Sequence, residues 1–169
     1  IARIPKIKII LYNFEKLSGY QFSSESVVNL VKKFPKNIIG CKDSGYNLFE
    51  NLKINNFLMF PGSESKLLKG LELGCAGCIS AVTNVTHSIA KKVFDDFESN
   101  KNQTMNNKLI QVRETFDQYN LISALHTFMS IGNDNFKNLL PPLILLSADK
   151  SNFFLSQLKK LKFNPQEIK

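Results

Sequence analysis

The stretch Ile38-Ile39-Gly40-Cys41-Lys42-Asp43-Ser44-Gly45 is an apolar run that carries one lysine directly into a polar turn containing glycine. Such a run, bounded by turn residues, predicts a buried β-strand. A residue at the carboxyl end of a parallel strand lies on the face where barrel enzymes build their active sites. A lysine amine placed there among apolar walls can form a Schiff base with a ketone. Lys42 is therefore a catalytic candidate, and the alternative is an ordinary surface lysine after a strand.

A second apolar run lies thirty residues upstream, at Ile7-Lys8-Ile9-Ile10-Leu11, and ends in Tyr12-Asn13. It predicts another strand with a reactive side chain at its carboxyl end. Because the carboxyl ends of parallel strands in βα units meet at one edge of a sheet, Tyr12 and Lys42 are expected to face one pocket. The alternative for Tyr12 is an aromatic rim residue whose hydroxyl is hydrated.

Short apolar runs alternate with helical periodicity from residue 7 to about residue 100, which predicts βα units. Four parallel strands are expected near residues 7–12, 38–42, 57–60 and 78–82. Helices are expected after a Ser23 or Ser24 cap, at about 47–53 and 67–71, and from a Thr86 cap onward. Four units are half of an eight-unit barrel, whose body usually has about 250 residues. Residues 106–119, 121–131 and 151–161 are expected to be helical.

The chain resembles the pyruvate-dependent class I aldolase family that includes dihydrodipicolinate synthase, N-acetylneuraminate lyase and the 2-keto-3-deoxy sugar acid aldolases. Four motifs carry the resemblance in the family's order: Tyr12-Asn13 through Gly19, Gly40 through Gly45, Pro61-Gly62-Ser63-Glu64, and Gly74 through Asn84. The resemblance implies the C-terminal half of a (β/α)8 barrel, with strands five to eight in residues 1–100. Residues 101–169 would be the helical C-terminal extension.

The resemblance also implies roles for five residues. Lys42 would be the Schiff-base lysine and Tyr12 the proton-transfer residue. Gly62 and Ser63 would contact the substrate at the end of the third strand, and Ile79 would form an apolar wall over the imine. Gly62, Ser63 and Ile79 could equally be ordinary turn and core positions. Asp43 is not expected to be catalytic, since its carboxylate could simply accept hydrogen bonds from turn amides.

The substrate is narrowed by one departure from the family pattern. The synthase branch has an arginine after the Tyr-Asn motif, and Leu17 stands in the corresponding place here. A lyase acting on pyruvate or a 2-keto-3-deoxy sugar acid therefore fits best. A dehydratase or dihydrodipicolinate synthase on the same scaffold stays open, as does a catalytically inactive half barrel that serves as an interaction module. The family's Gly-Thr-Thr carboxylate-binding loop belongs to the half that this sequence lacks.

The composition of the chain argues against several classes of binding partner. The net charge of +8 comes from dispersed lysines, with Arg3 and Arg113 the only arginines, which argues against a nucleic-acid surface. Three cysteines without zinc-site spacing predict neither a disulfide framework nor a bound metal, and no cofactor is expected. No apolar run has membrane-span length, so a cytoplasmic protein is expected. The missing initial Met predicts a fragment of a longer enzyme, and the fragment is expected to be inactive by itself. The resemblance implies that the full-length enzyme is a homotetramer.

Overall fold

The computed structural model describes residue 4 and residues 6–164. The chain divides into two compact units, Ile1–Ser80 and Ala81–Lys169, which we call unit 1 and unit 2. Unit 1 carries the β-sheet, whereas the regular elements described in unit 2 are helices. The division into half barrel and extension expected near residue 100 falls inside unit 2 and stays a prediction.

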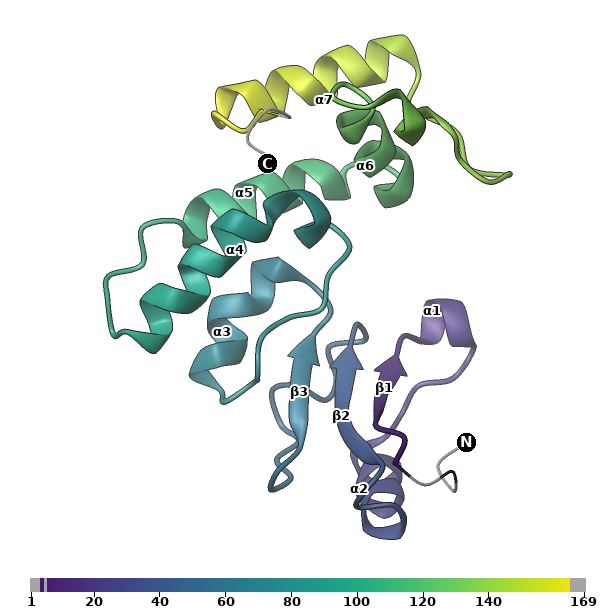
Figure 1. Ribbon diagram of the computed structural model, residues 1–169, viewed down its shortest axis with the longest axis vertical. Coiled ribbons are helices and arrows are strands. Elements are labelled where there is room, and N and C mark those ends of the chain that lie inside the picture. The colour runs from purple at the N-terminus through teal and green to yellow at the C-terminus, as the bar shows by residue number, and fades with distance from the viewer. Residues whose placement is uncertain (1–3, 5, 165–169) are drawn as a thin grey trace. The chain divides into compact units, whose positions relative to one another are not determined.

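The sheet of unit 1 consists of β1 (Ile9–Asn13), β2 (Ile38–Asp43) and β3 (Leu58–Pro61). The strands are parallel and lie in the order β1-β2-β3, which is also their order along the chain (Figure 1). Right-handed βα crossovers place successive strands side by side in this way. Three of the four expected strands are thus confirmed, each within two residues of its expected bounds.

The fourth expected strand, at residues 78–82, is wrong. The chain does run along β3, because Ala76 N donates to Met59 O at 2.9 Å and Ile79 N donates to Pro61 O at 3.2 Å. These donors are three residues apart, whereas a parallel ladder uses every second residue. Gly77 lies between them with φ of +145° and interrupts the extended run. The segment therefore follows the edge of β3 without forming a strand.

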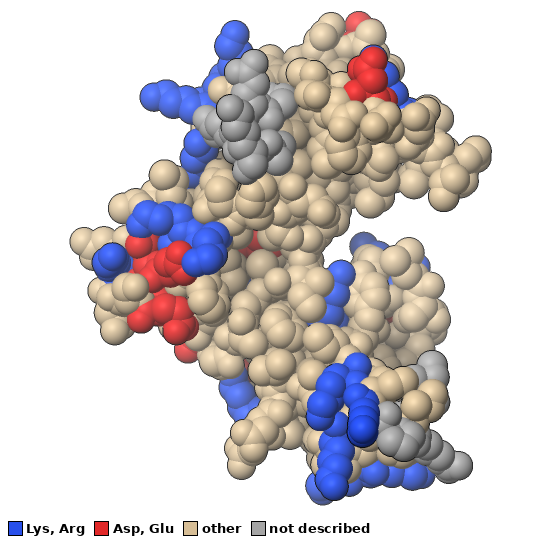
Figure 2. Space-filling view, viewed as in Figure 1, with Lys and Arg blue, Asp and Glu red and all other residues tan. Residues whose placement is uncertain are grey.

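The helices of unit 1 are α1 (Glu15–Ser18), α2 (Ser24–Lys33), the 3-10 turn η1 (Glu64–Lys66) and α3 (Leu67–Glu72). Ser23 caps α2 as expected, since its Oγ accepts from Ser26 N at 3.1 Å. Lys32 and Lys33 occupy the last turn of α2, where they complement the negative end of the helix dipole. Figure 2 shows basic side chains gathered at this end of unit 1.

The helix expected at residues 47–53 is also wrong, because residues 44–51 form bends and turns. The reason lies in Asp43. Its carboxylate accepts from Tyr46 N at 3.0 Å, Leu48 N at 2.8 Å and Phe49 N at 2.9 Å. Hydrogen bonds from a side chain to nearby amides offer the backbone an alternative to a helical ladder, and this loop is wound around Asp43.

The core of unit 1 lies between α2 and one face of the sheet. Phe49 is 1% exposed, and burying a side chain of that size contributes about 1.5–3 kcal/mol. The cluster comprises Val27, Cys41, Leu48, Phe49, Leu52, Met59 and Cys75. Because side chains of a strand alternate between faces, burial of Cys41 and Met59 turns Lys42 and Phe60 to the other face.

Unit 2 contains α4 (Thr83–Glu98), α5 (Asn106–Asp117), α6 (Leu121–Met129), the 3-10 turn η2 (Asp134–Lys137) and α7 (Ala148–Lys160). The three helices expected after residue 100 are confirmed. Thr86 is not the cap of α4. It lies within the first turn, is fully buried, and its Oγ1 donates to Val82 O at 3.0 Å.

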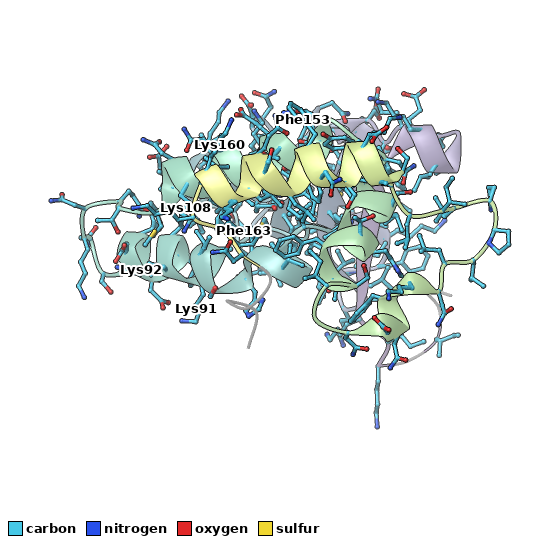
Figure 3. The ribbon with its side chains drawn as sticks, turned by 90° about the horizontal axis from the view of Figure 1, so that it is seen from above. Lys91, Lys92, Lys108, Phe153, Lys160 and Phe163 are labelled. Atoms are coloured by element: carbon cyan, nitrogen blue, oxygen red, sulfur yellow. The ribbon has the colours of Figure 1, made fainter. Side chains whose placement is uncertain are left out.

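Aromatic rings dominate the core of unit 2. Phe116 contacts Phe128 and Phe154 at centroid distances of 5.8 and 5.0 Å, and Phe163 stacks on Phe128 at 5.2 Å. Outside this core, Lys91 and Lys92 extend from α4 (Figure 3) and pair with Asp95 and Asp96 one turn later. Within residues 4 and 6–164, the structure contains no helix with both the length and the apolar character needed to cross a bilayer.

Candidate functional site

Lys42 and Tyr12 lie next to each other at the carboxyl ends of β2 and β1. Their Cα atoms are register partners, so both side chains project from the same face of the sheet. The Lys42 Nζ stands 4.2 Å from the centroid of the Tyr12 ring. A cation over a tyrosine ring contributes about 0.5–1 kcal/mol at an exposed site. The two residues expected to share a pocket are therefore brought into contact.

The surface around this pair is apolar and accessible. Tyr12 is 44% exposed, and Ile10 on the same face of β1 is 41% exposed. Leu58, which lies on this face of β3, is 42% exposed. The helix α2 covers only the opposite face through the core described above. An amine on this face can be reached by a small carbonyl compound, and its neighbours are largely hydrocarbon.

Directly behind the pair, on the buried face, lie Asn13 and Asp43. Both are fully buried, and Asn13 Nδ2 donates to Asp43 Oδ1 at 2.8 Å. The three turn amides bound by Asp43 confirm the expectation that this carboxylate satisfies the turn. Sequence reasoning missed the partnership with Asn13. The sequence did contain a sign of this hydrogen bond. A polar residue follows each catalytic candidate at a position that faces the core, in Tyr12-Asn13 and in Lys42-Asp43.

The turn after β3 approaches the turn after β2 very closely. Gly62 N donates to Asp43 O at 2.8 Å, and a Cβ atom on Gly62 would lie 2.1 Å from Ser44 Oγ. Only glycine fits this approach. Ser63 is 3% exposed, and its Oγ lies 2.9 Å from Ser65 Oγ and accepts from Ser65 N at 3.3 Å. Ser63 thus caps η1, and its contact with a substrate stays a prediction.

Two further residues flank this turn. Ile79 is 36% exposed and is tied by its backbone to the end of β3, as described above. Glu64 is fully buried and accepts a hydrogen bond from Ser80 Oγ. Sequence reasoning gave Glu64 no role, because an acidic residue in a Gly-Ser turn usually faces water. The role of Ile79 as a wall over a bound group stays a prediction.

Cys41 and Cys75 are poor nucleophiles, because each thiol has a raised pKa. Burial, with a smaller contribution from the Asp43 carboxylate, raises the pKa of Cys41 to about 12. Burial also raises the pKa of Cys75, against the opposing effect of Lys53. Within the described part of the chain, no group of three or more His, Cys, Asp or Glu side chains could hold a metal ion. Cys75 and Cys78 do not form a disulfide with each other.

Comparison with known proteins gives consistent matches in sequence and structure. Residues 1–161 match the model of the Dihydrodipicolinate synthetase family. The 4-hydroxy-tetrahydrodipicolinate synthase of Methanococcoides burtonii is 26% identical over 95% of this chain and 58% of its own length. The 2-dehydro-3-deoxy-D-gluconate/2-dehydro-3-deoxy-phosphogluconate aldolase of Picrophilus torridus is 23% identical over 80% of this chain and 53% of its own length.

Solved structures share the fold. The dihydrodipicolinate synthase of Cyanidioschyzon merolae, solved with lysine bound, aligns with a TM-score of 0.82 at 16% identity, covering 94% of this chain and 56% of that one. YagE from Escherichia coli K12, solved with pyruvate, aligns with a TM-score of 0.77 at 20% identity over 92% of this chain and 56% of that one. The chain spans about half the length of these relatives. Because the family model covers nearly all of it, this chain belongs to the dihydrodipicolinate synthase family, whose members include class I aldolases and lyases.

Proposed function

We propose that the protein containing this chain is a Schiff-base-forming lyase that acts on pyruvate or a 2-keto-3-deoxy sugar acid. The observation that carries the proposal is the contact between the Lys42 amine and the Tyr12 ring at the ends of adjacent parallel strands. Family membership supports the reaction class. The match to an aldolase of 2-dehydro-3-deoxy sugar acids, and Leu17 in place of an arginine, favour the sugar acid.

In the proposed reaction, the neutral amine of Lys42 attacks the ketone carbon of the 2-oxo acid and forms a carbinolamine. Loss of water from the carbinolamine gives a protonated imine. The carbon–carbon bond then breaks, and its electron pair moves into the imine to give an enamine. Tyr12 donates the proton that leaves with the hydroxyl group and takes up the proton released when the aldehyde forms. Tyr12 then passes this proton to the enamine carbon, which restores the protonated imine. Hydrolysis of the imine releases the 2-oxo acid and the free amine and returns a proton to Tyr12.

The remaining expected residues complete this proposal. Gly62 would let the backbone after β3 approach the substrate, Ser63 would contribute a polar contact, and Ile79 would cover the imine. The carboxylate-binding loop would come from four further βα units, which would also close the barrel over the accessible face around Ile10 and Leu58. Without them the 169-residue chain would be inactive. The complete enzyme would assemble as a homotetramer and need neither metal nor cofactor.

Trapping with borohydride tests the reaction class. When the complete protein is incubated with pyruvate and sodium borohydride, we expect the mass of a reduced pyruvyl group on Lys42, since borohydride reduces an imine but not a free amine. Lys42→Ala should abolish the label, whereas Lys53→Ala at the other end of the sheet should retain it. A label that survives Lys42→Ala would contradict the proposal.

Activity assays distinguish the proposed lyase from the two alternatives, a dihydrodipicolinate synthase and a catalytically inactive half-barrel module. Rapid native condensation of pyruvate with aspartate semialdehyde would identify a dihydrodipicolinate synthase. A complete protein that gives no pyruvate adduct would instead support the inactive half barrel.

A further inference from the structure

We infer that Asn13 and Asp43 are positioning residues that fix the Lys42 amine relative to the Tyr12 ring. The inference rests on the proposed function, in which this amine and this phenol act on the same carbon. Neither Asn13 nor Asp43 reaches the face where Lys42 and Tyr12 lie, because successive side chains of a strand point to opposite faces. Their effect on the reaction would therefore pass through the backbone.

The link between the two strands is made by the fully buried Asn13 and Asp43 and the partly buried Asn47. Asn13 Nδ2 donates to Asp43 Oδ1 at 2.8 Å and to Asn47 Oδ1 at 2.7 Å. Asn13 Oδ1 accepts from Phe22 N at 2.9 Å, and Asn47 Nδ2 donates to Phe22 O at 3.0 Å. Asn13, Asp43 and Asn47, which we call the clamp, therefore tie together the chain after β1 and the chain after β2.

Only one orientation of the clamp side chains satisfies all of their hydrogen bonds. Asp43 accepts four hydrogen bonds, three from backbone amides and one from Asn13. The amide of Asn13 faces an N–H donor on its oxygen side and two acceptors on its nitrogen side, so a flipped amide would oppose like groups. Buried polar groups with all partners present fix a structure strongly, since any displacement leaves a group unpaired.

Backbone hydrogen bonds connect the clamp residues to the turns at the carboxyl ends of the strands. Ser44 N and Gly45 N both donate to Asn13 O, at 2.9 and 3.1 Å, and Gly62 N donates to Asp43 O at 2.8 Å. The turns that follow β2 and β3 are thus anchored to the residues next to Tyr12 and Lys42. A displacement of about 1 Å at a reacting group can cost about 10²-fold in rate, so the clamp would matter for chemistry as well as for stability.

Exchanging the two clamp residues tests the inference. Asn13→Asp places two carboxylates against each other. Asp43→Asn places the NH2 group of an amide against N–H donors that now bind a carboxylate oxygen. The double variant Asn13→Asp/Asp43→Asn restores a hydrogen bond between positions 13 and 43 with its direction reversed. The measurement, in the complete protein, is the rate constant and the amplitude of borohydride-trapped imine formation at saturating pyruvate. The amplitude counts folded sites, whereas the rate constant reports on the placement of the amine.

We expect each single variant to lower the rate constant about 10²-fold. The exchange should recover part of this loss, because the amide at position 43 still meets Tyr46 N and the carboxylate at position 13 still meets Asn47 Oδ1. Lower amplitudes with unchanged rate constants would show a purely structural role and overturn the inference. The same holds if the exchange restores stability but not the rate constant.

Gly45→Ala tests the clamp without removing a polar group. A Cβ atom on Gly45 would lie 2.9 Å from Asn47 Oδ1 and 3.2 Å from Asn13 Nδ2, so it must displace the clamp. We expect a rate constant at least tenfold lower. Gly132→Ala is the matched control, because its Cβ would come no closer than 3.9 Å to Met129 O. Equal rate constants in the two alanine variants would contradict the inference, even if the single clamp variants do not fold.

A spectroscopic readout separates this inference from the proposed function. The Tyr12 ring should shift the NMR signals of the Lys42 ε-methylene protons upfield, since Nζ lies 4.2 Å from the ring centroid. That shift should shrink at least twofold in Gly45→Ala and remain unchanged in Gly132→Ala. If pyruvate labels no variant but the shift behaves in this way, the proposed function fails and the positioning stands. An unchanged shift in Gly45→Ala overturns the positioning alone.

Discussion

At the scale of single residues, the candidate site depends on the alternation of side chains along two strands. Tyr12 and Lys42 face the accessible side, and the residues that follow them face the buried side. One strand therefore delivers a reactive group and its anchor in consecutive positions. The same alternation buries Cys41 and makes it unreactive, although it adjoins Lys42.

Tyr12→Phe should lower kcat of the complete protein about 10²- to 10⁴-fold, because a positioned acid–base group contributes that much. The phenyl ring keeps the contact with Lys42, so the concentration of 2-oxo acid that half-saturates imine formation should change little. Steady-state kinetics and borohydride trapping measure the two quantities. Wild-type kcat in this variant would refute the proton-transfer role.

Alkaline pH should destabilise the chain through Cys41. Its thiol has a pKa of about 12 in the folded state against 9.0 for an unperturbed thiol. Between these values the unfolded chain has lost a proton that the folded chain retains, so the free energy of unfolding falls as pH rises. One such group contributes about 1.4 kcal/mol per pH unit above pH 9. Urea unfolding at pH 8, 9 and 10 should show a shallower decline of the free energy of unfolding for Cys41→Ala than for the unmodified chain.

At the scale of elements, some segments take their structure from neighbouring residues and others from residues on another strand. The start of α2 is set locally by the Ser23 cap, whereas the loop between β2 and β3 takes its shape from Asp43, which Asn13 of β1 holds across the sheet. The segment beside β3 shows a third case, in which two backbone hydrogen bonds hold an extended chain without completing a ladder. We therefore expect the loop around Asp43, unlike the start of α2, to be sensitive to substitution of Asn13.

Ser23→Ala should lower the free energy of unfolding by about 1 kcal/mol, since it leaves Ser26 N without its capping oxygen. Ser24→Ala is a suitable control. Ser24 is also exposed and lies next to Ser23, but in α2 it makes no side-chain cap. Urea unfolding monitored by circular dichroism gives both values. Equal stability of the two variants would contradict the cap.

At the scale of the whole molecule, unit 1 leaves one face of its sheet without helices, and apolar side chains lie on it. The outer edge of β1 also has no neighbouring strand among the described residues. Exposed apolar faces and free strand edges promote association. A closed barrel of the family would bury such a face.

The 169-residue chain should therefore associate as its concentration rises, which sedimentation velocity would detect. Ile10→Lys should weaken this association, because it puts a charge on the accessible face of β1, where Ile10 is 41% exposed. Leu17→Lys adds the same charge on α1, at a residue that is 76% exposed, and should leave association unchanged. Equal effects of the two variants would show that the sheet face is not the contact.

The sequence by itself determined the strands β1, β2 and β3, the helices after residue 100, and the placement of Tyr12 and Lys42 at strand ends. These follow from short apolar runs, turn residues and side-chain alternation, all of which act between neighbours in the chain. Only the tertiary structure decided that residues 78–82 do not pair as a strand and that residues 44–51 are not a helix. It alone joined Asn13 to Asp43 and Asn47. The bonds of Asn13 join groups about thirty residues apart. The other two outcomes depend on the buried Asp43 carboxylate and on backbone hydrogen bonds to β3, and no apolar periodicity specifies either.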